Sequence, residues 1–177
     1  RPAPSAQNGS AASVATSRGP SPGALAAMRD AATPELVGPY SPDLNAGFRD
    51  RFGLELFGRG RDEGFEIIGT EGAQAGVGYA ALACLNPGDE VICTDPGYFH
   101  FVPAFRLCGA VPRFVRLGPA NGWRLDPDEV AAAIGPRTKM IVVCDPLNPF
   151  GTVQRREELE ALLRLSAERR VILLADS

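Results

Sequence analysis

From residue 65 onward, short apolar runs alternate with stretches of helical periodicity. The clearest run covers residues 140–144 and stops at two prolines, an asparagine and a glycine, as a buried strand does before a turn. The other predicted strands are residues 65–69, 90–94, 111–117 and 171–175. The predicted helices are residues 73–85, 98–108, 126–134 and 155–169. This alternation predicts an α/β fold, with a three-layer, mostly parallel sheet and helices on both faces.

The beginning of the chain lacks this regularity. Residues 1–24 are rich in Ala, Ser, Pro and Gly, and no acidic residue precedes Asp30, so we expect a flexible arm that cannot fold alone. The same composition also fits a transit peptide, although arginines are few. The chain begins at Arg1 and not at Met, which suggests a fragment or a processed product.

Three segments are therefore predicted. They are the arm at residues 1–24, a helical and loop segment at residues 25–60, and part of one large domain at residues 61–177. Around the second segment the pattern predicts a helix at residues 22–33, a loop at residues 38–45 around Tyr40, and an amphipathic stretch at residues 48–57.

The composition argues against nucleic acid and membranes as partners. The net charge of -3, without a long basic cluster, argues against nucleic acid. No apolar run approaches the roughly 20 residues needed to span a bilayer, so we expect a soluble protein.

The cysteines fall singly inside apolar patterns, without the paired spacing of a zinc or redox site. They are Cys84, Cys93, Cys108 and Cys144. We interpret them as small core residues of a protein in a reducing compartment such as the cytoplasm, and we expect no metal. His100 is the only histidine, and its place in an aromatic-rich predicted helix favours packing over catalysis.

Polar residues follow four strands of the predicted sheet. The candidates are Gly72-Ala73-Gln74, residues 95–98, residues 145–148 and Asp176. Because the carboxyl ends of parallel strands share one edge, these groups should converge on a single crevice. The glycines do not follow Gly-x-Gly-x-x-Gly, and no Gly-Lys-Ser/Thr occurs, which disfavours a dinucleotide fold and a P-loop.

Each candidate also has an ordinary structural interpretation. Gly72 could simply form a strand-to-helix turn, although a helix start also offers free N–H groups to a phosphate. Tyr98 could lie over a flat ligand or could be a core aromatic. Asn148 could only close a turn between prolines. Asp176 ends an apolar strand, where a carboxylate needs water, donors or a cation, such as a protonated ring nitrogen.

Taken in order, several motifs resemble one known family. They are residues 70–74 (TEGAQ), 85–91 (LNPGDEV), 95–98 (DPGY), 137–139 (RTK), 148–151 (NPFG) and 174–176 (LAD). Their order and spacing resemble the first half of the large domain of class I/II, fold type I, aminotransferases that depend on pyridoxal 5′-phosphate. The resemblance covers residues 65–177 well and residues 18–60 loosely.

The resemblance implies a role for each candidate. Ala73 and Gln74 would hold the cofactor phosphate, and Tyr98 would stack on the pyridine ring. Asn148 would donate to the phenolic oxygen, with its bond to Pro149 expected to be cis. Asp176 would pair with the ring nitrogen and keep it protonated. It also implies amino acid and keto acid substrates and a homodimer with shared sites.

The sequence departs from the family in places. Phe150 replaces the usual threonine, and Ser177 replaces the usual acid after Asp176. The family's Schiff-base lysine has no counterpart here, because the only lysine, Lys139, begins a strand roughly 15 Å from the ligand edge. We therefore expect no catalytic residue in this chain, and no transamination by it alone.

Three hypotheses remain open. The first is the amino-terminal part of a pyridoxal-phosphate aminotransferase. The second is a carbon-sulfur lyase of the same fold, because the residues present serve the cofactor and not the reaction. The third is a non-catalytic binding module that holds the cofactor without a covalent bond.

Overall fold

The structure, a computed structural model, describes residues 19–38, 46–58 and 66–177. The chain divides into two units, Arg1–Phe65 and Glu66–Ser177. The described helices of the first unit are α1 (Pro22–Ala31), α2 (Pro34–Val37) and α3 (Ala46–Phe57). Helix α1 confirms the helix predicted at residues 22–33, and α3 covers the predicted amphipathic stretch at residues 48–57, whereas α2 was not predicted. Most of the predicted arm and the loop around Tyr40 lie outside the described residues.

The second unit contains four parallel strands. They are β1 (Glu90–Asp95), β2 (Val111–Arg116), β3 (Thr138–Cys144) and β4 (Ile172–Asp176), in the order β2-β1-β3-β4. Between them lie α4 (Ala73–Cys84), α5 (Phe101–Leu107), the 3₁₀ turn η1 (Pro119–Asn121), α6 (Pro127–Ala133) and α7 (Arg156–Arg169).

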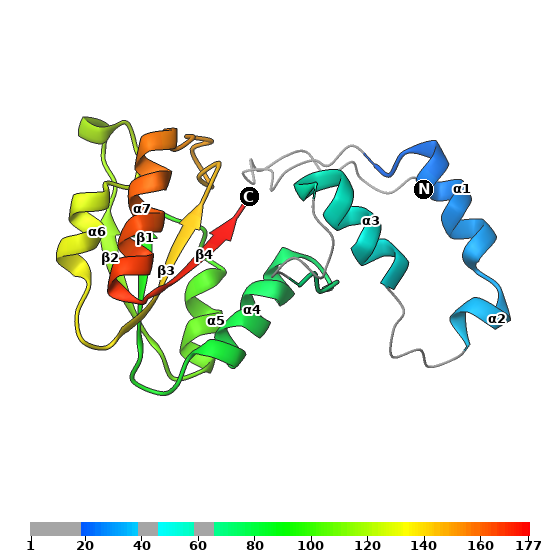
Figure 1. The fold of residues 1–177 in the computed structure, drawn as a ribbon, viewed down its shortest axis with the longest axis horizontal. Coiled ribbons are helices and arrows are strands. Elements are labelled where there is room, and N and C mark those ends of the chain that lie inside the picture. The colour runs from blue at the N-terminus through cyan, green and yellow to red at the C-terminus, as the bar shows by residue number, and fades with distance from the viewer. Residues whose placement is uncertain (1–18, 39–45, 59–65) are drawn as a thin grey trace, which may run out of the picture. The chain divides into compact units, whose positions relative to one another are not determined.

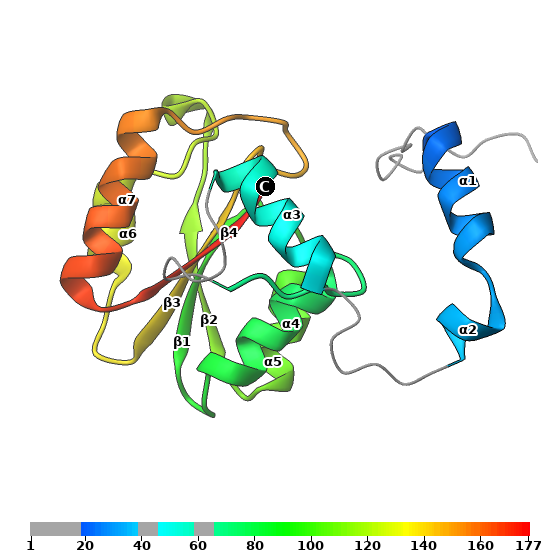
Figure 2. The ribbon, with the colours of Figure 1, turned by 45° about the vertical axis from the view of Figure 1, so that its right-hand side comes forward.

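The sheet is covered on both faces. Helices α4 and α5 lie on one face, and α6 and α7 lie on the other (Figure 1, Figure 2). Alternate strand residues supply the two cores, as the pleat requires. Val91 and Met140 pack with α4 and α5, whereas Ile92 and Ile141 pack with α6 and α7. The predicted three-layer α/β fold is confirmed.

The polar residues between strands define where the helices begin. The side chain of Asp126 accepts a hydrogen bond of 2.9 Å from the amide of Asp128, and Pro127 occupies the first turn of α6. At α7, the carboxylate of Glu158 accepts a hydrogen bond of 2.8 Å from the amide of Arg155. These caps satisfy amides that have no partner inside the helix, and they fix the point at which each strand connection ends.

Three expectations differ from the structure. The predicted strand at residues 65–69 is wrong, because the described residues 66–69 pair with no described strand. Helix α5 begins at Phe101, so the exposed His100 precedes the helix, although its ring packs against the rings of Tyr98 and Phe99 at centroid distances of 5.2 Å and 4.0 Å. Cys84 is exposed and is not a core residue.

The described residues contain neither a membrane span nor a metal cluster. None of the described helices is both long and apolar enough to cross a membrane. The same residues contain no cluster of three or more His, Cys, Asp or Glu side chains that could hold a metal ion.

Candidate functional site

The predicted residues meet in one pocket at the carboxyl edge of the sheet. The pocket has a volume of about 310 Å³ and is lined by Gly72, Ala73, Gln74, Tyr98, Phe101, Asn148 and Asp176. The lining comes from the start of α4, the β1–α5 turn, the loop after β3 and the end of β4. The predicted convergence is therefore confirmed. Phe101, which the sequence did not single out, also lines the pocket.

The start of α4 presents unpaired donors to this pocket. Gly72 has φ +87° and ψ 164°, a backbone conformation that residues with a side chain rarely adopt, and it provides no side-chain cap. The first turn of α4 contains no acidic residue. The amide groups at this end therefore keep their hydrogen-bonding capacity and the positive end of the helix dipole, which together suit an anion.

Gln74 joins the helix start to the neighbouring turn. Its Nε2 donates a hydrogen bond of 3.1 Å to the backbone carbonyl of His100. This bond connects α4 to the segment that carries Tyr98, although the two lie far apart in sequence. The two walls of the pocket are thereby held at a fixed spacing.

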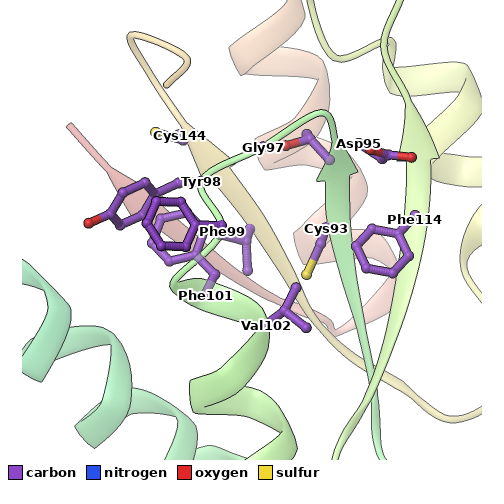
Figure 3. Close-up of a pocket in the computed structure, with 11 residues that line it drawn as sticks. Cys93, Asp95, Gly97, Tyr98, Phe99, Phe101, Val102, Phe114 and Cys144 are labelled. Carbon is purple, nitrogen blue, oxygen red and sulfur yellow. The ribbon is translucent and has the colours of Figure 1, made fainter. Parts of the chain in front are cut away.

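Tyr98 is positioned by a tight turn and by aromatic contacts. The Asp95–Pro96 bond is cis, and a Cβ atom on Gly97 would lie 2.5 Å from Oγ1 of Thr94, so only glycine fits there. The ring of Phe101 contacts the Tyr98 ring edge-on at a centroid distance of 5.2 Å. A second cavity of about 120 Å³ lies beside Tyr98, where the rings of Tyr98, Phe99 and Phe101 gather (Figure 3).

Asn148 lies on the loop after β3, and its bond to Pro149 is cis, as expected. Its side chain is exposed and makes no hydrogen bond to another residue of the described ranges. The amide therefore remains available to a ligand in the pocket.

Asp176 ends β4 beside a thiol. Sγ of Cys144 lies 3.7 Å from Oδ2 of Asp176, as a weak hydrogen bond. Burial raises the pKa of the Cys144 thiol, and the carboxylates of Asp176 and Asp145 add to the rise, while the backbone amide of Asn148 opposes it. The thiol is thus neutral at pH 7 and can donate to Asp176. No other described residue hydrogen-bonds the Asp176 side chain, which leaves it free for a cationic ligand group.

Comparison with known proteins identifies the family. The family described as "Aminotransferase class I and II" matches residues 17–177. This chain belongs to the class I and II aminotransferases. Aspartate aminotransferase from Sulfurisphaera tokodaii is 37% identical over 113 residues, covering 63% of this chain and 28% of that protein. A probable N-acetyl-LL-diaminopimelate aminotransferase from Bacillus subtilis is 35% identical over 148 residues, covering 80% and 37%.

Solved aminotransferases share the fold. YbdL from Escherichia coli, whose structure and reactivity identify a methionine aminotransferase function, superimposes with a TM-score of 0.65 at 31% identity, covering 72% of this chain and 33% of YbdL. Aspartate aminotransferase from Thermus thermophilus, with maleate, gives a TM-score of 0.56 at 40% identity, covering 58% and 27%. The chain thus spans only 28% to 37% of the length of the two relatives named above.

The one lysine of this aminotransferase chain lies away from the pocket. Lys139 is exposed near the start of β3, whereas Asn148 follows the other end of that strand. Lys139 lines a separate groove of about 450 Å³ together with Arg169 and Arg170. The predicted place of Lys139, at the amino edge of the sheet, is therefore confirmed.

Proposed function

We propose that the pocket at the carboxyl edge binds pyridoxal phosphate, and that the chain is part of an enzyme that transfers an amino group from an amino acid to a 2-keto acid. One observation carries the proposal. A helix start, an aromatic ring, an amide and a carboxylate, from four separate segments, line the same pocket of about 310 Å³. These groups match the phosphate, the ring face, the phenolic oxygen and the ring nitrogen of that cofactor.

The phosphate end fits the start of α4. The amides of Ala73 and Gln74 have no capping side chain, and Gly72 adds no Cβ atom to the pocket wall. An anion bound there is stabilised by direct hydrogen bonds and by the helix dipole. Gln74 adds a polar side chain whose position its bond to His100 fixes.

The ring end fits the other three side chains. Tyr98 offers a flat face supported by Phe101, and Asn148 offers an amide without a protein partner. The Asp176 carboxylate would hold the proton on the ring nitrogen, because an adjacent negative charge raises the pKa of that nitrogen. When bound, pyridoxal phosphate supplies an electron sink for the carbanion chemistry of amino acids.

The amine that captures the cofactor aldehyde is not among these 177 residues, because Lys139 lies at the opposite edge of the sheet. We propose that the chain binds the cofactor reversibly and does not transaminate alone. Amino acid and keto acid substrates and a homodimer belong to the complete enzyme.

The experiment titrates the 177-residue chain with pyridoxal phosphate, followed by absorbance, and then treats the mixture with borohydride. We expect saturable binding that dialysis reverses, and no covalent adduct by mass spectrometry. Absence of saturable binding would overturn the cofactor assignment. A reduced adduct on Lys139 would instead overturn the assignment of Lys139 as a residue outside the site.

A substrate test then distinguishes the reaction class in an enzyme that contains this chain together with a Schiff-base lysine. We expect amino transfer to a keto acid. Release of pyruvate or a thiol without amino transfer would identify the lyase of the same fold and contradict the proposed reaction.

A further inference from the structure

The loop that carries Asn148 is closed by two backbone hydrogen bonds. Residues 145–152 connect β3 to the segment before α7; the amide of Leu147 donates to the carbonyl of Thr152 at 2.8 Å, and the amide of Gly151 donates to the carbonyl of Leu147 at 2.6 Å. Only Leu147 of this loop is buried. Residues 148–151 form the exposed tip of this turn, so the orientation of the tip against the rest of the protein also depends on contacts with other segments.

One external contact is an aromatic stack. The ring of Trp123 stacks on the ring of Phe150, with centroids 4.5 Å apart and planes at 29°. Trp123 adopts φ +61°, directly after Gly122 at φ +63°. Two successive left-handed residues are unfavourable when the second is bulky, so the surrounding contacts must hold this turn. The amide of Trp123 donates to the carbonyl of Gly118 at 2.9 Å.

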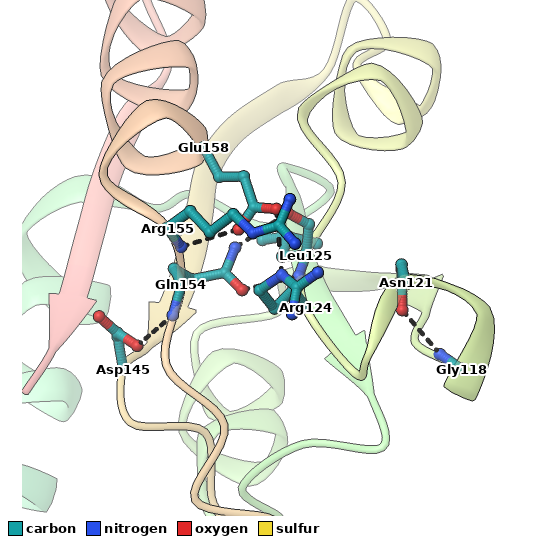
Figure 4. Close-up of polar contacts among 8 residues, drawn as sticks. All are labelled: Gly118, Asn121, Arg124, Leu125, Asp145, Gln154, Arg155 and Glu158. Atoms are coloured by element: carbon teal, nitrogen blue, oxygen red, sulfur yellow. Dashed lines mark hydrogen bonds and ion pairs between the residues drawn. The ribbon is translucent and has the colours of Figure 1, made fainter.

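The second contact is a side-chain amide that pairs with the backbone. Nε2 of Gln154 donates to the carbonyl of Leu125, and Oε1 of Gln154 accepts from the amide of Leu125, both at 2.9 Å (Figure 4). The amide of Gln154 also donates to Oδ1 of Asp145 at 2.9 Å. Only a carboxamide side chain can donate and accept in this way.

An ion pair extends this contact to α7. Nε of Arg124 lies 3.1 Å from Oε1 of Glu158, the residue that also caps the helix (Figure 4). Both side chains are largely buried, at 22% and 21% exposed. We name residues 118–125 the brace, because this segment contacts the Asn148 loop through Phe150 and the start of α7 through Gln154 and Glu158.

We propose that Trp123, Phe150 and Gln154 are positioning residues for Asn148. The brace holds the tip of the loop so that the Asn148 amide lies in the pocket wall. This inference rests on the proposed function, because it assigns Asn148 to the cofactor. It also gives Phe150 a role: the ring that stands in place of the family's usual threonine provides the surface on which Trp123 stacks.

The test compares three variants of the 177-residue chain. Phe150→Thr removes the stack, and Gln154→Glu keeps the acceptor but removes the donor to Leu125. The control is Phe114→Thr on the outer strand β2, since Phe114 is 51% exposed and Phe150 is 47% exposed. We expect pyridoxal phosphate affinity to fall roughly fivefold in the first two variants and to stay unchanged in the control.

A double-mutant cycle separates positioning from a merely structural role. In an Asn148→Ala background, Phe150→Thr should cause no further loss of affinity, because its effect passes through Asn148. An equal loss in both backgrounds, or wild-type affinity in both brace variants, would overturn the inference.

A measurement without cofactor keeps this test distinct from that of the proposed function. Trp123 is the only tryptophan of the chain, so near-ultraviolet circular dichroism and fluorescence report on the stack directly. We expect Phe150→Thr to change both signals, and an unchanged signal would overturn the stack itself. If the wild-type chain shows the stack but binds no pyridoxal phosphate, the proposed function fails, and the positioning role fails with it.

Discussion

The two edges of the parallel sheet use polar side chains in opposite ways. At the amino edge, Glu90 is 5% exposed and lies 3.0 Å from Nη2 of Arg137 and 3.4 Å from Nε of Arg113. At the carboxyl edge, the side chains of Asn148 and Asp176 face the pocket, and the Cys144 thiol donates one weak hydrogen bond to Asp176. Glu90 is thus paired within the protein, whereas Asn148 and Asp176 have little pairing within the described residues and are the groups proposed to meet a ligand.

This difference separates side chains that contribute to the free energy of unfolding from side chains that contribute to cofactor affinity. Substitutions at the amino edge should lower the free energy of unfolding and leave cofactor affinity unchanged. Substitutions at the carboxyl edge should do the reverse, because side chains without protein partners contribute little to folding. Both quantities can be measured in the 177-residue chain, by urea unfolding and by titration with pyridoxal phosphate.

The largest effect should come from Asp176→Asn. The substitution removes the negative charge proposed to pair with the ring nitrogen, and a hydrogen bond between charged groups contributes about 2 to 3 kcal/mol. We expect the dissociation constant of pyridoxal phosphate to rise roughly 30- to 150-fold, measured by absorbance titration, with little change in urea unfolding.

Asp95→Asn is the matched control for that prediction. Asp95 also ends a strand of the sheet, but it lines the smaller cavity beside Tyr98 and not the proposed cofactor pocket. Its removal should leave affinity within about twofold. Equal losses in the two variants would indicate a general effect of negative charge at this edge and would contradict the assigned pairing.

The next effect belongs to the amino edge. Glu90→Gln keeps the shape of the side chain but removes its charge beside two arginines. We expect a loss of about 1.5 to 2 kcal/mol in the free energy of unfolding, less than for a fully buried pair, because the arginines are 57% and 70% exposed. Cofactor affinity should not change.

Glu160→Gln controls for charge alone. Glu160 also lies between two arginines, at 4.0 Å from each, but it is 51% exposed on α7. Its loss should cost less than about 0.5 kcal/mol. If Glu90→Gln cost no more than that, the amino edge would not be held by its ion pairs.

How far the sequence predicts each region depends on the range of the interactions involved. Residues 140–144 were recognisable as a strand because an apolar run is a local property, and β3 confirms it. The run at residues 65–69 looked similar, but a strand exists only where a neighbour supplies a ladder, and no described strand pairs with residues 66–69.

The pocket shows the same distinction. Topology alone predicted that Tyr98, Asn148 and Asp176 would converge, because parallel strands end at one edge. Gln74 also lines the pocket, but the strand that was predicted to lead to it does not exist in the described residues. The stack of Trp123 on Phe150 could not be predicted, because it depends on how two loops pack against each other. Phe101 was likewise missed, since a phenylalanine at the start of a helix looks like any core residue.

The interior between the two edges holds a buried thiol, Cys93. Burial raises the pKa of the Cys93 thiol from its ordinary value of 9.0 to about 12. The unfolded chain therefore loses this proton at lower pH than the folded chain, so stability is full below about pH 9 and falls as the pH rises toward 12. At pH 10 the loss should be about 1.4 kcal/mol.

Comparison with Cys93→Ala measures this contribution. The slope of unfolding free energy against pH, between pH 8 and 10.5, should be shallower in Cys93→Ala than in the wild type. Cys84→Ala should leave the slope unchanged, because Cys84 is exposed. Identical slopes in wild type and Cys93→Ala would mean that water reaches the middle of the sheet.

The smallest effect should come from Gln74→Met, which keeps the side-chain length but removes the hydrogen bond to the carbonyl of His100. We expect a loss of about 0.5 to 1 kcal/mol in unfolding free energy and a roughly threefold loss of cofactor affinity, since Gln74 both supports the wall and lines the pocket.

Tyr79→Phe is the control on the same helix, α4. It removes a hydrogen bond of 2.9 Å from Tyr79 to Glu71, but Tyr79 does not line the pocket. A similar loss of affinity in Tyr79→Phe would show that α4 acts through its general stability. A loss of affinity confined to Gln74→Met would show that this side chain belongs to the binding edge. Gln74 would then be the exception to the division between the two edges, because it also supports the fold.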